Sequence, residues 1–92
     1  MSIQWLFDVI EDRKQNPAEK SYTSSLFRDG LSRIAQKVGE EGTEVVVAAL
    51  SQDDERLIEE VADLTYHILV LLSARGIKPV QVLEELEKRH MK

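Results

Sequence analysis

Five acidic side chains in two short segments are the residues of this sequence best suited to chemistry. The first segment holds Glu40, Glu41 and Glu44, and the second holds Glu60 and Asp63 after a spacer of fifteen residues. Each segment contains an acidic pair three residues apart. On an α-helix such residues lie about 60° apart around the axis and one turn along it. Both carboxylates of a pair can therefore reach one ion.

A short turn between two helices would bring the two acidic pairs together. Helices joined in this way pack antiparallel, so four carboxylates can converge. Their mutual repulsion is relieved by a cation, and oxygen ligands select hard ions such as magnesium, which also binds substrate phosphates. Acidic pairs are also common on solvated helix faces. Because both pairs interrupt apolar runs, and because Gly42 and Ala62 let helices approach closely, the residues alone leave the two interpretations balanced.

Hydrophobic periodicity predicts helices and no strands. Pro79 suits the first turn of a last helix, Gly76 suits the end of the preceding one, and the Ser51-x-x-Asp54 spacing suits a helix start. Asp29-Gly30 can kink or split the second helix. We expect a long loop over 15–25, and helices over about 2–13, 24–50 and 51–75 and from residue 79 onward. The fold class is thus all-α, a four- to five-helix antiparallel arrangement.

The third expected helix is apolar on more than one stripe. Its apolar residues are Leu57, Ile58, Val61, Leu64, Ile68, Leu69, Leu71 and Leu72. A helix that is apolar on most faces must be buried on most faces. We therefore expect one all-α domain over residues 1–92 that homodimerisation completes as a helical bundle.

The amino-acid composition excludes several classes of function for this protein. The 92 residues contain no cysteine, which excludes disulfides, thiolate zinc sites and cysteine nucleophiles. The formal net charge is -5, so binding to a nucleic-acid polymer is not expected. The N-terminus lacks the apolar run of a secretory signal, and no stretch suits a membrane span. We expect a cytoplasmic protein without a membrane or nucleic-acid partner.

The acidic pattern E-E-x-x-E, a spacer and E-x-x-D resembles the metal motif of the all-alpha nucleoside triphosphate pyrophosphohydrolase superfamily. Within it, the chain resembles the phosphoribosyl-ATP pyrophosphohydrolase family over nearly its whole length. The matching segments are Ser21-Tyr22-Thr23, Lys37-Val38-Gly39-Glu40-Glu41, Glu44-Val45 and Glu60-Val61-Ala62-Asp63-Leu64. The resemblance implies magnesium-dependent hydrolysis of phosphoribosyl-ATP between its α and β phosphates in histidine biosynthesis, giving phosphoribosyl-AMP and pyrophosphate.

Carried over residue by residue, the resemblance implies four metal ligands: Glu41, Glu44, Glu60 and Asp63. These would neutralise phosphate charge and lower the pKa of a bound water. Glu40 is the candidate catalytic residue, which orients or deprotonates the attacking water or instead pairs with a lysine.

The candidate substrate-binding residues are cations and hydroxyls near the acidic motif. Lys37 lies one turn before Glu41 and can reach phosphate oxygens or form a helix-surface ion pair. The loop residues that suit phosphate or ribose are Lys20, Ser21, Tyr22 and Thr23. His67 follows Asp63 by one turn and either hydrogen-bonds it or is structural, and we expect Trp5 and Phe7 to pack in the core.

Two other functions remain open. A house-cleaning pyrophosphohydrolase of nucleoside or deoxynucleoside triphosphates would use the same ligands with a different base pocket. A helical dimerisation module would carry the acidic patch without catalysis. Magnesium-dependent pyrophosphate release separates the enzymes from the module, and substrate profiling separates the enzymes from each other.

Overall fold

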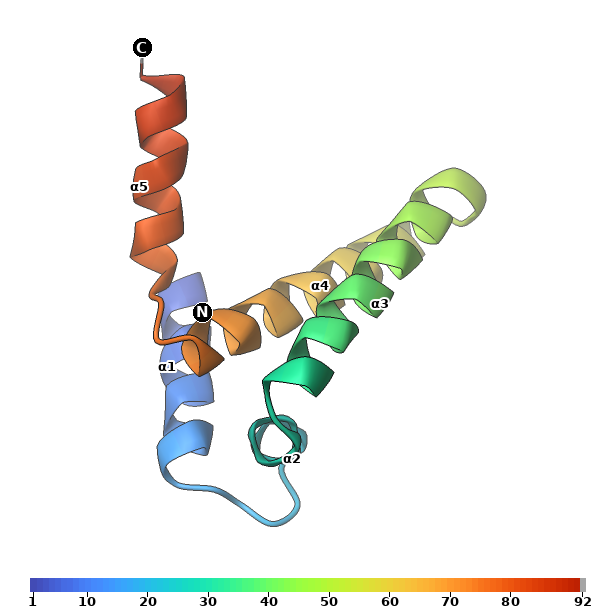
Figure 1. The fold of residues 1–92 in the computed structure, drawn as a ribbon. Coiled ribbons are helices and arrows are strands. Elements are labelled where there is room, and N and C mark those ends of the chain that lie inside the picture. The colour runs from blue at the N-terminus through green and yellow to red at the C-terminus, as the bar shows by residue number, and fades with distance from the viewer. Residues whose placement is uncertain (92) are drawn as a thin grey trace.

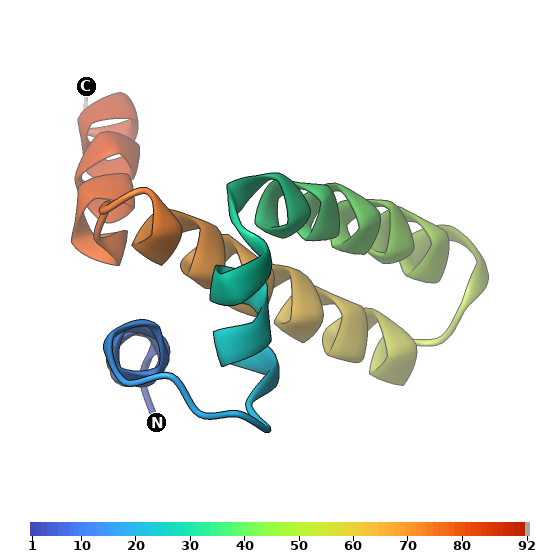
Figure 2. The ribbon, with the colours of Figure 1, turned by 60° about the horizontal axis from the view of Figure 1, so that its bottom comes forward.

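The computed structural model describes residues 1–91 as five α-helices and no strands, which confirms the all-α prediction. Figure 1 shows α3 and α4 side by side as a long antiparallel pair, with α2 lying across one end of it (Figure 2). The helix α5 turns away from this pair after α4. The helices are α1 (Ile3–Gln15), α2 (Tyr22–Asp29), α3 (Leu31–Ser51), α4 (Asp54–Ala74) and α5 (Pro79–His90).

Side-chain caps and two glycines set the ends of the helices. Ser2 caps α1 as predicted, since its Oγ accepts a hydrogen bond from the Trp5 N–H at 3.0 Å. Gly30, with φ of 99°, separates α2 from α3, which confirms the split at Asp29-Gly30. Gly76, with φ of 70°, follows the end of α4 as predicted.

Two predicted boundaries are wrong. The cap of α4 is Asp53, whose carboxylate accepts from the Arg56 N–H at 2.9 Å, whereas Ser51 ends α3. Both residues are good caps, so local chemistry did not choose between them. The predicted loop over 15–25 is also too long, because the helix α2 already begins at Tyr22.

The core lies where α1, α2 and the adjoining ends of α3 and α4 meet. Its buried residues are Phe7, Ile10, Leu26, Ile34, Leu69 and Val70. Phe7 packs in the core as predicted, but Trp5 is 53% exposed. This core holds α2 against the α3–α4 pair and so sets the position of Ser21, Tyr22 and Thr23.

Polar side chains tie α1 to the end of α4 beside this core. The buried Ser73 hydroxyl donates to the Glu11 carboxylate, and the Lys14 ammonium contacts both Glu11 at 2.9 Å and the Ser73 carbonyl at 2.8 Å. The Ser73 hydrogen bond and the Lys14 ammonium hold the pKa of Glu11 below its ordinary value. The ionised form of Glu11 therefore stabilises the fold.

This cluster makes the stability depend on pH. A carboxyl whose pKa is lowered on folding contributes stability above its unfolded pKa of about 4.3, and that stability is lost as the pH falls through the folded value. We expect Glu11→Gln to lower the unfolding free energy by about 1 kcal/mol at pH 7 and by much less at pH 3. Urea denaturation at both pH values measures this. The loop variant Glu19→Gln is the control, and an equal loss at both pH values would contradict the role of the charge.

Large apolar side chains remain on the surface of α4 and α5 within the single chain. On α4, Ile58 is 69% exposed and Val61 is 43% exposed, and Leu83 on α5 is 56% exposed. The broad apolar surface predicted for α4 is therefore only partly covered by the other helices. None of the helices described in residues 1–91 combines the length and the hydropathy of a membrane-spanning segment.

Candidate metal and active site

Three carboxylates converge between α3 and α4. Glu41 on α3 and Glu60 and Asp63 on α4 each offer an oxygen, and these oxygens lie within 4.8 Å of one another. Glu41 is 7% exposed and Glu60 is 4% exposed, whereas Asp63 lies open to solvent. The antiparallel packing of the two helices thus brings the two acidic segments together, as predicted.

Each of the two buried carboxylates has one oxygen paired with a cation and one that has no partner among residues 1–91. The Lys37 ammonium lies 3.4 Å from Glu41 Oε1, and the Arg56 guanidinium donates to Glu60 Oε1 at 2.6 Å. Within residues 1–91, Glu41 Oε2 and Glu60 Oε2 are buried and accept no hydrogen bond. A buried, unpaired carboxylate oxygen costs considerable free energy. An oxygen-only donor set with two such atoms fits a hard divalent cation.

Glu44 lies outside this three-carboxylate cluster. It is exposed on α3 and lines a neighbouring cavity of about 270 Å³ together with Glu60 and Arg56. The sequence predicted four convergent ligands, and the structure of residues 1–91 groups three of them. Glu44 therefore borders the site, and its role as a ligand stays a prediction.

Glu40 is exposed and pairs with its neighbours on α3. It accepts a hydrogen bond from the Gln36 amide at 2.9 Å and lies 3.5 Å from the Lys37 ammonium, and these contacts lower the pKa of Glu40. Burial alone would lower the pKa of Lys37, but Tyr22, Glu41 and Glu40 outweigh it and raise that pKa. At neutral pH Glu40 is a carboxylate and Lys37 an ammonium. The pairing of Glu40 with a lysine, which the sequence left as one alternative, is therefore seen in the structure with Lys37.

Three of the four predicted loop residues belong to the start of α2. Ser21 caps the helix, with its Oγ accepting from the Ser24 N–H at 3.1 Å. The Tyr22 hydroxyl lies 3.0 Å from His67 Nε2, and Thr23 hydrogen-bonds to the Tyr66 hydroxyl. The first turn of α2 is thereby tied to the turn of α4 that follows Asp63. Lys20 is exposed just before it.

A family model for phosphoribosyl-ATP pyrophosphohydrolase matches residues 4–90. The chain belongs to the phosphoribosyl-ATP pyrophosphohydrolase family. It is 54% identical over 87 residues to a phosphoribosyl-ATP pyrophosphatase of Clostridium botulinum strain Hall. The aligned residues make up 95% of this chain and 79% of that relative. A protein of the same name from Sulfurisphaera tokodaii is 54% identical over 84 residues, or 91% of this chain and 89% of the relative. A third phosphoribosyl-ATP pyrophosphatase, from Lacticaseibacillus casei, is 54% identical over 91 residues, which are 99% of this chain and 83% of the relative.

Two residues of this family member that contact the site were missed in the sequence. Arg56 lies four residues before Glu60, and a helix places opposite charges at this spacing close together. The ion pair between Arg56 and Glu60 could therefore have been predicted. Tyr66 is half-buried, and its burial raises the pKa of its hydroxyl, which stays protonated beside Thr23. The pairing of Tyr66 with Thr23 joins two helices and has no local sequence pattern.

Proposed function

We propose that Glu41, Glu60 and Asp63, with Glu44 at the border of the site, hold magnesium against the phosphates of phosphoribosyl-ATP. The family is one of hydrolases of histidine biosynthesis that release pyrophosphate from this substrate. The supporting observation is the pair of buried carboxylate oxygens, Glu41 Oε2 and Glu60 Oε2, that accept no hydrogen bond within the described chain. Magnesium would supply charge neutralisation for phosphate oxygens and activate water.

The remaining site residues have roles in this proposal that follow from their charge. Water adds across the anhydride bond between the α and β phosphates, which breaks to give phosphoribosyl-AMP and pyrophosphate. Glu40 is a carboxylate at neutral pH and accepts the proton of the attacking water. Lys37 is an ammonium that can turn from its acidic neighbours to a phosphate oxygen.

The start of α2 supplies the other proposed substrate contacts. Ser21, Tyr22 and Thr23 are held at the edge of the site by their contacts with α4 and by the helix cap. Their hydroxyls and the N–H groups at the start of the helix suit a ribose or a phosphate. Lys20 adds a positive charge just before this turn.

A pyrophosphate-release assay tests the function and the metal together. We expect release from phosphoribosyl-ATP only with millimolar magnesium, at a kcat/KM at least about a hundredfold above that for common ribo- and deoxyribonucleoside triphosphates. Magnesium should also raise the melting temperature in a calorimeter, because it binds the folded chain only. Equal turnover of deoxynucleotides would identify a house-cleaning enzyme instead. A folded protein that releases no pyrophosphate would identify a non-catalytic helical module.

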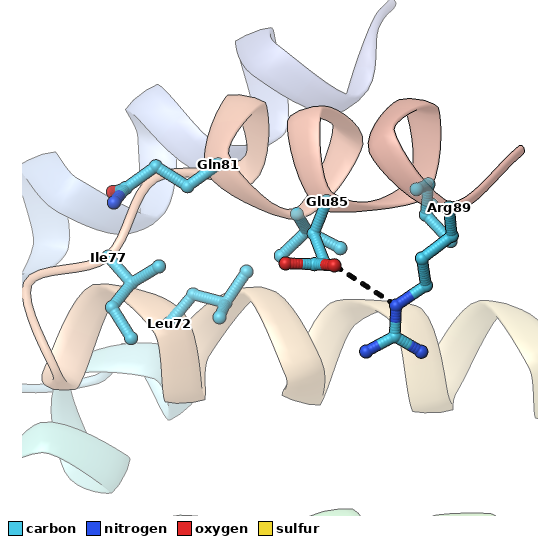
Figure 3. A pocket seen from close by; sticks show the side chains of 7 residues that line it. Leu72, Ile77, Gln81, Glu85 and Arg89 are labelled. Carbon is cyan, nitrogen blue, oxygen red and sulfur yellow. Dashed lines mark hydrogen bonds and ion pairs between the residues drawn. The ribbon is translucent and has the colours of Figure 1, made fainter. Parts of the chain in front are cut away.

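We also propose that two copies associate through α4 and α5. Between these helices lies a groove of about 400 Å³, shown with its lining residues Leu72, Ile77, Gln81, Glu85 and Arg89 labelled in Figure 3. A second groove, of about 240 Å³, lies beside it and is lined by Ile68, Leu83 and other apolar residues. Exposed apolar surface of this extent is typical of an interaction surface. A mass of two chains, measured by analytical ultracentrifugation, would support this proposal.

We propose that residues 1–92, of which the structure describes 1–91, form one domain that carries the whole activity in the cytoplasm. Helices from both halves of the chain share one core, which supports a single folding unit. The absence of cysteine suits a reducing compartment.

A further inference from the structure

His67 is a buried histidine with two hydrogen bonds to groups at the site. Its side chain is 5% exposed on α4. Its Nδ1 lies 2.7 Å from the main-chain oxygen of Asp63, and its Nε2 lies 3.0 Å from the hydroxyl of Tyr22. The contact to Asp63 thus involves the backbone, not the carboxylate. The imidazole joins a residue of the acidic cluster to the first turn of α2.

The chemistry of these partners determines the direction of each hydrogen bond. A carbonyl oxygen only accepts, so His67 Nδ1 carries a proton and donates to Asp63. In the neutral ring Nε2 then accepts, and the Tyr22 hydroxyl donates to it. We call this chain of two hydrogen bonds the Tyr22–His67–Asp63 link.

Aromatic packing around His67 reinforces the link. The Tyr66 ring lies edge-on to the imidazole, with centroids 4.9 Å apart, and the Tyr22 ring lies edge-on at 5.8 Å. Thr23 bonds to the Tyr66 hydroxyl one residue further along α2. Two consecutive residues of α2 are therefore held by two consecutive residues of α4.

We propose that His67 is a positioning residue, which holds the substrate-binding turn of α2 in register with the metal-binding turn of α4 through the Tyr22–His67–Asp63 link. This inference rests on the proposed function, which assigns substrate contacts to α2 and the metal to Glu60 and Asp63. The carboxylate ligands lie on α3 and α4 and do not depend on the link. Breaking the link therefore weakens substrate binding and leaves metal affinity in place.

A double-mutant cycle tests the link. Tyr22→Phe removes one hydroxyl from a partly exposed ring, and His67→Phe keeps a ring while removing both nitrogens. We expect each variant to raise the KM for phosphoribosyl-ATP about tenfold with kcat changed less than about threefold. The double variant should raise KM no further than about twofold beyond the worse single variant, because both changes break one link. Mn²⁺ affinity without substrate, measured by electron paramagnetic resonance, should stay within about threefold of wild type.

Three outcomes of the cycle would overturn the proposal. The first is a double variant whose KM change is the product of the single changes, since Tyr22 and His67 would then act independently. The second is an unchanged KM in folded His67→Phe. The third is a Mn²⁺ affinity that falls as much as KM rises. His67→Gln, whose amide can again meet the Tyr22 hydroxyl, should recover part of the loss, and His90→Gln on α5 is the matched histidine control.

A spectroscopic readout separates the link from the proposed function. The chain has two histidines, so the side-chain ¹⁵N resonances of His67 can be assigned with the His90→Gln variant. We expect the Nδ1–H tautomer in the wild type and a shifted Nε2 resonance in Tyr22→Phe. An unshifted resonance overturns the link, even if His67→Phe does not fold. Wild-type protein that shows the link without hydrolysing phosphoribosyl-ATP contradicts the proposed function instead.

Discussion

Replacing Glu60 by glutamine is expected to lower kcat/KM for pyrophosphate release by about a thousandfold, or about 4 kcal/mol of transition-state stabilisation. The substitution keeps the size of the side chain and removes the charge from a buried oxygen that accepts no hydrogen bond within residues 1–91. The unfolding free energy should fall by no more than about 1 kcal/mol, because Arg56 is 48% exposed and still pairs with Glu59. Steady-state assays and urea denaturation measure the two effects.

Glu59→Gln is the matched control for Glu60→Gln. Glu59 also pairs with Arg56, at 2.7 Å, but it is exposed and does not belong to the carboxylate cluster. We expect its kcat/KM to stay within about threefold of wild type, as is usual for surface charges. Glu60→Gln protein that keeps a tenth or more of the wild-type activity would contradict the role of Glu60 as a metal ligand.

Leu26→Ala is expected to cost about 2–5 kcal/mol of unfolding free energy, because Leu26 is fully buried where α2 meets the core. That is a large share of the stability of a domain of this size. Leu31→Ala should cost less than half as much, since Leu31 is 45% exposed. Chemical denaturation of both variants measures the difference. Equal losses would contradict the burial of α2 against α3.

The sequence was sufficient to predict the helices and the meeting of the two acidic segments. Helical periodicity predicts the helices and a short turn between the second and the third of them, and helices joined by so short a turn pack antiparallel. The exact position of that turn, at residues 52–53, was not predicted, because Ser51 and Asp53 are both good caps. The loop before α2 was predicted too long because its hydroxyl residues disfavour helix. In the structure, the buried Ser24 hydroxyl bonds instead to the Arg13 carbonyl and the Ala18 N–H. That contact spans two segments and has no local pattern.

The sequence by itself determined the all-α class, the family motif and the acidic residues that face each other across α3 and α4. Only the tertiary structure decided which of them meet closely, which of their oxygens lack a partner in the described part of the chain, and that Glu44 lies at the border. It also decided that Tyr22 reaches His67, 45 positions away. The physical reason is that periodicity relates residues on one helix, whereas the rotation and crossing of packed helices depend on how their side chains fit together.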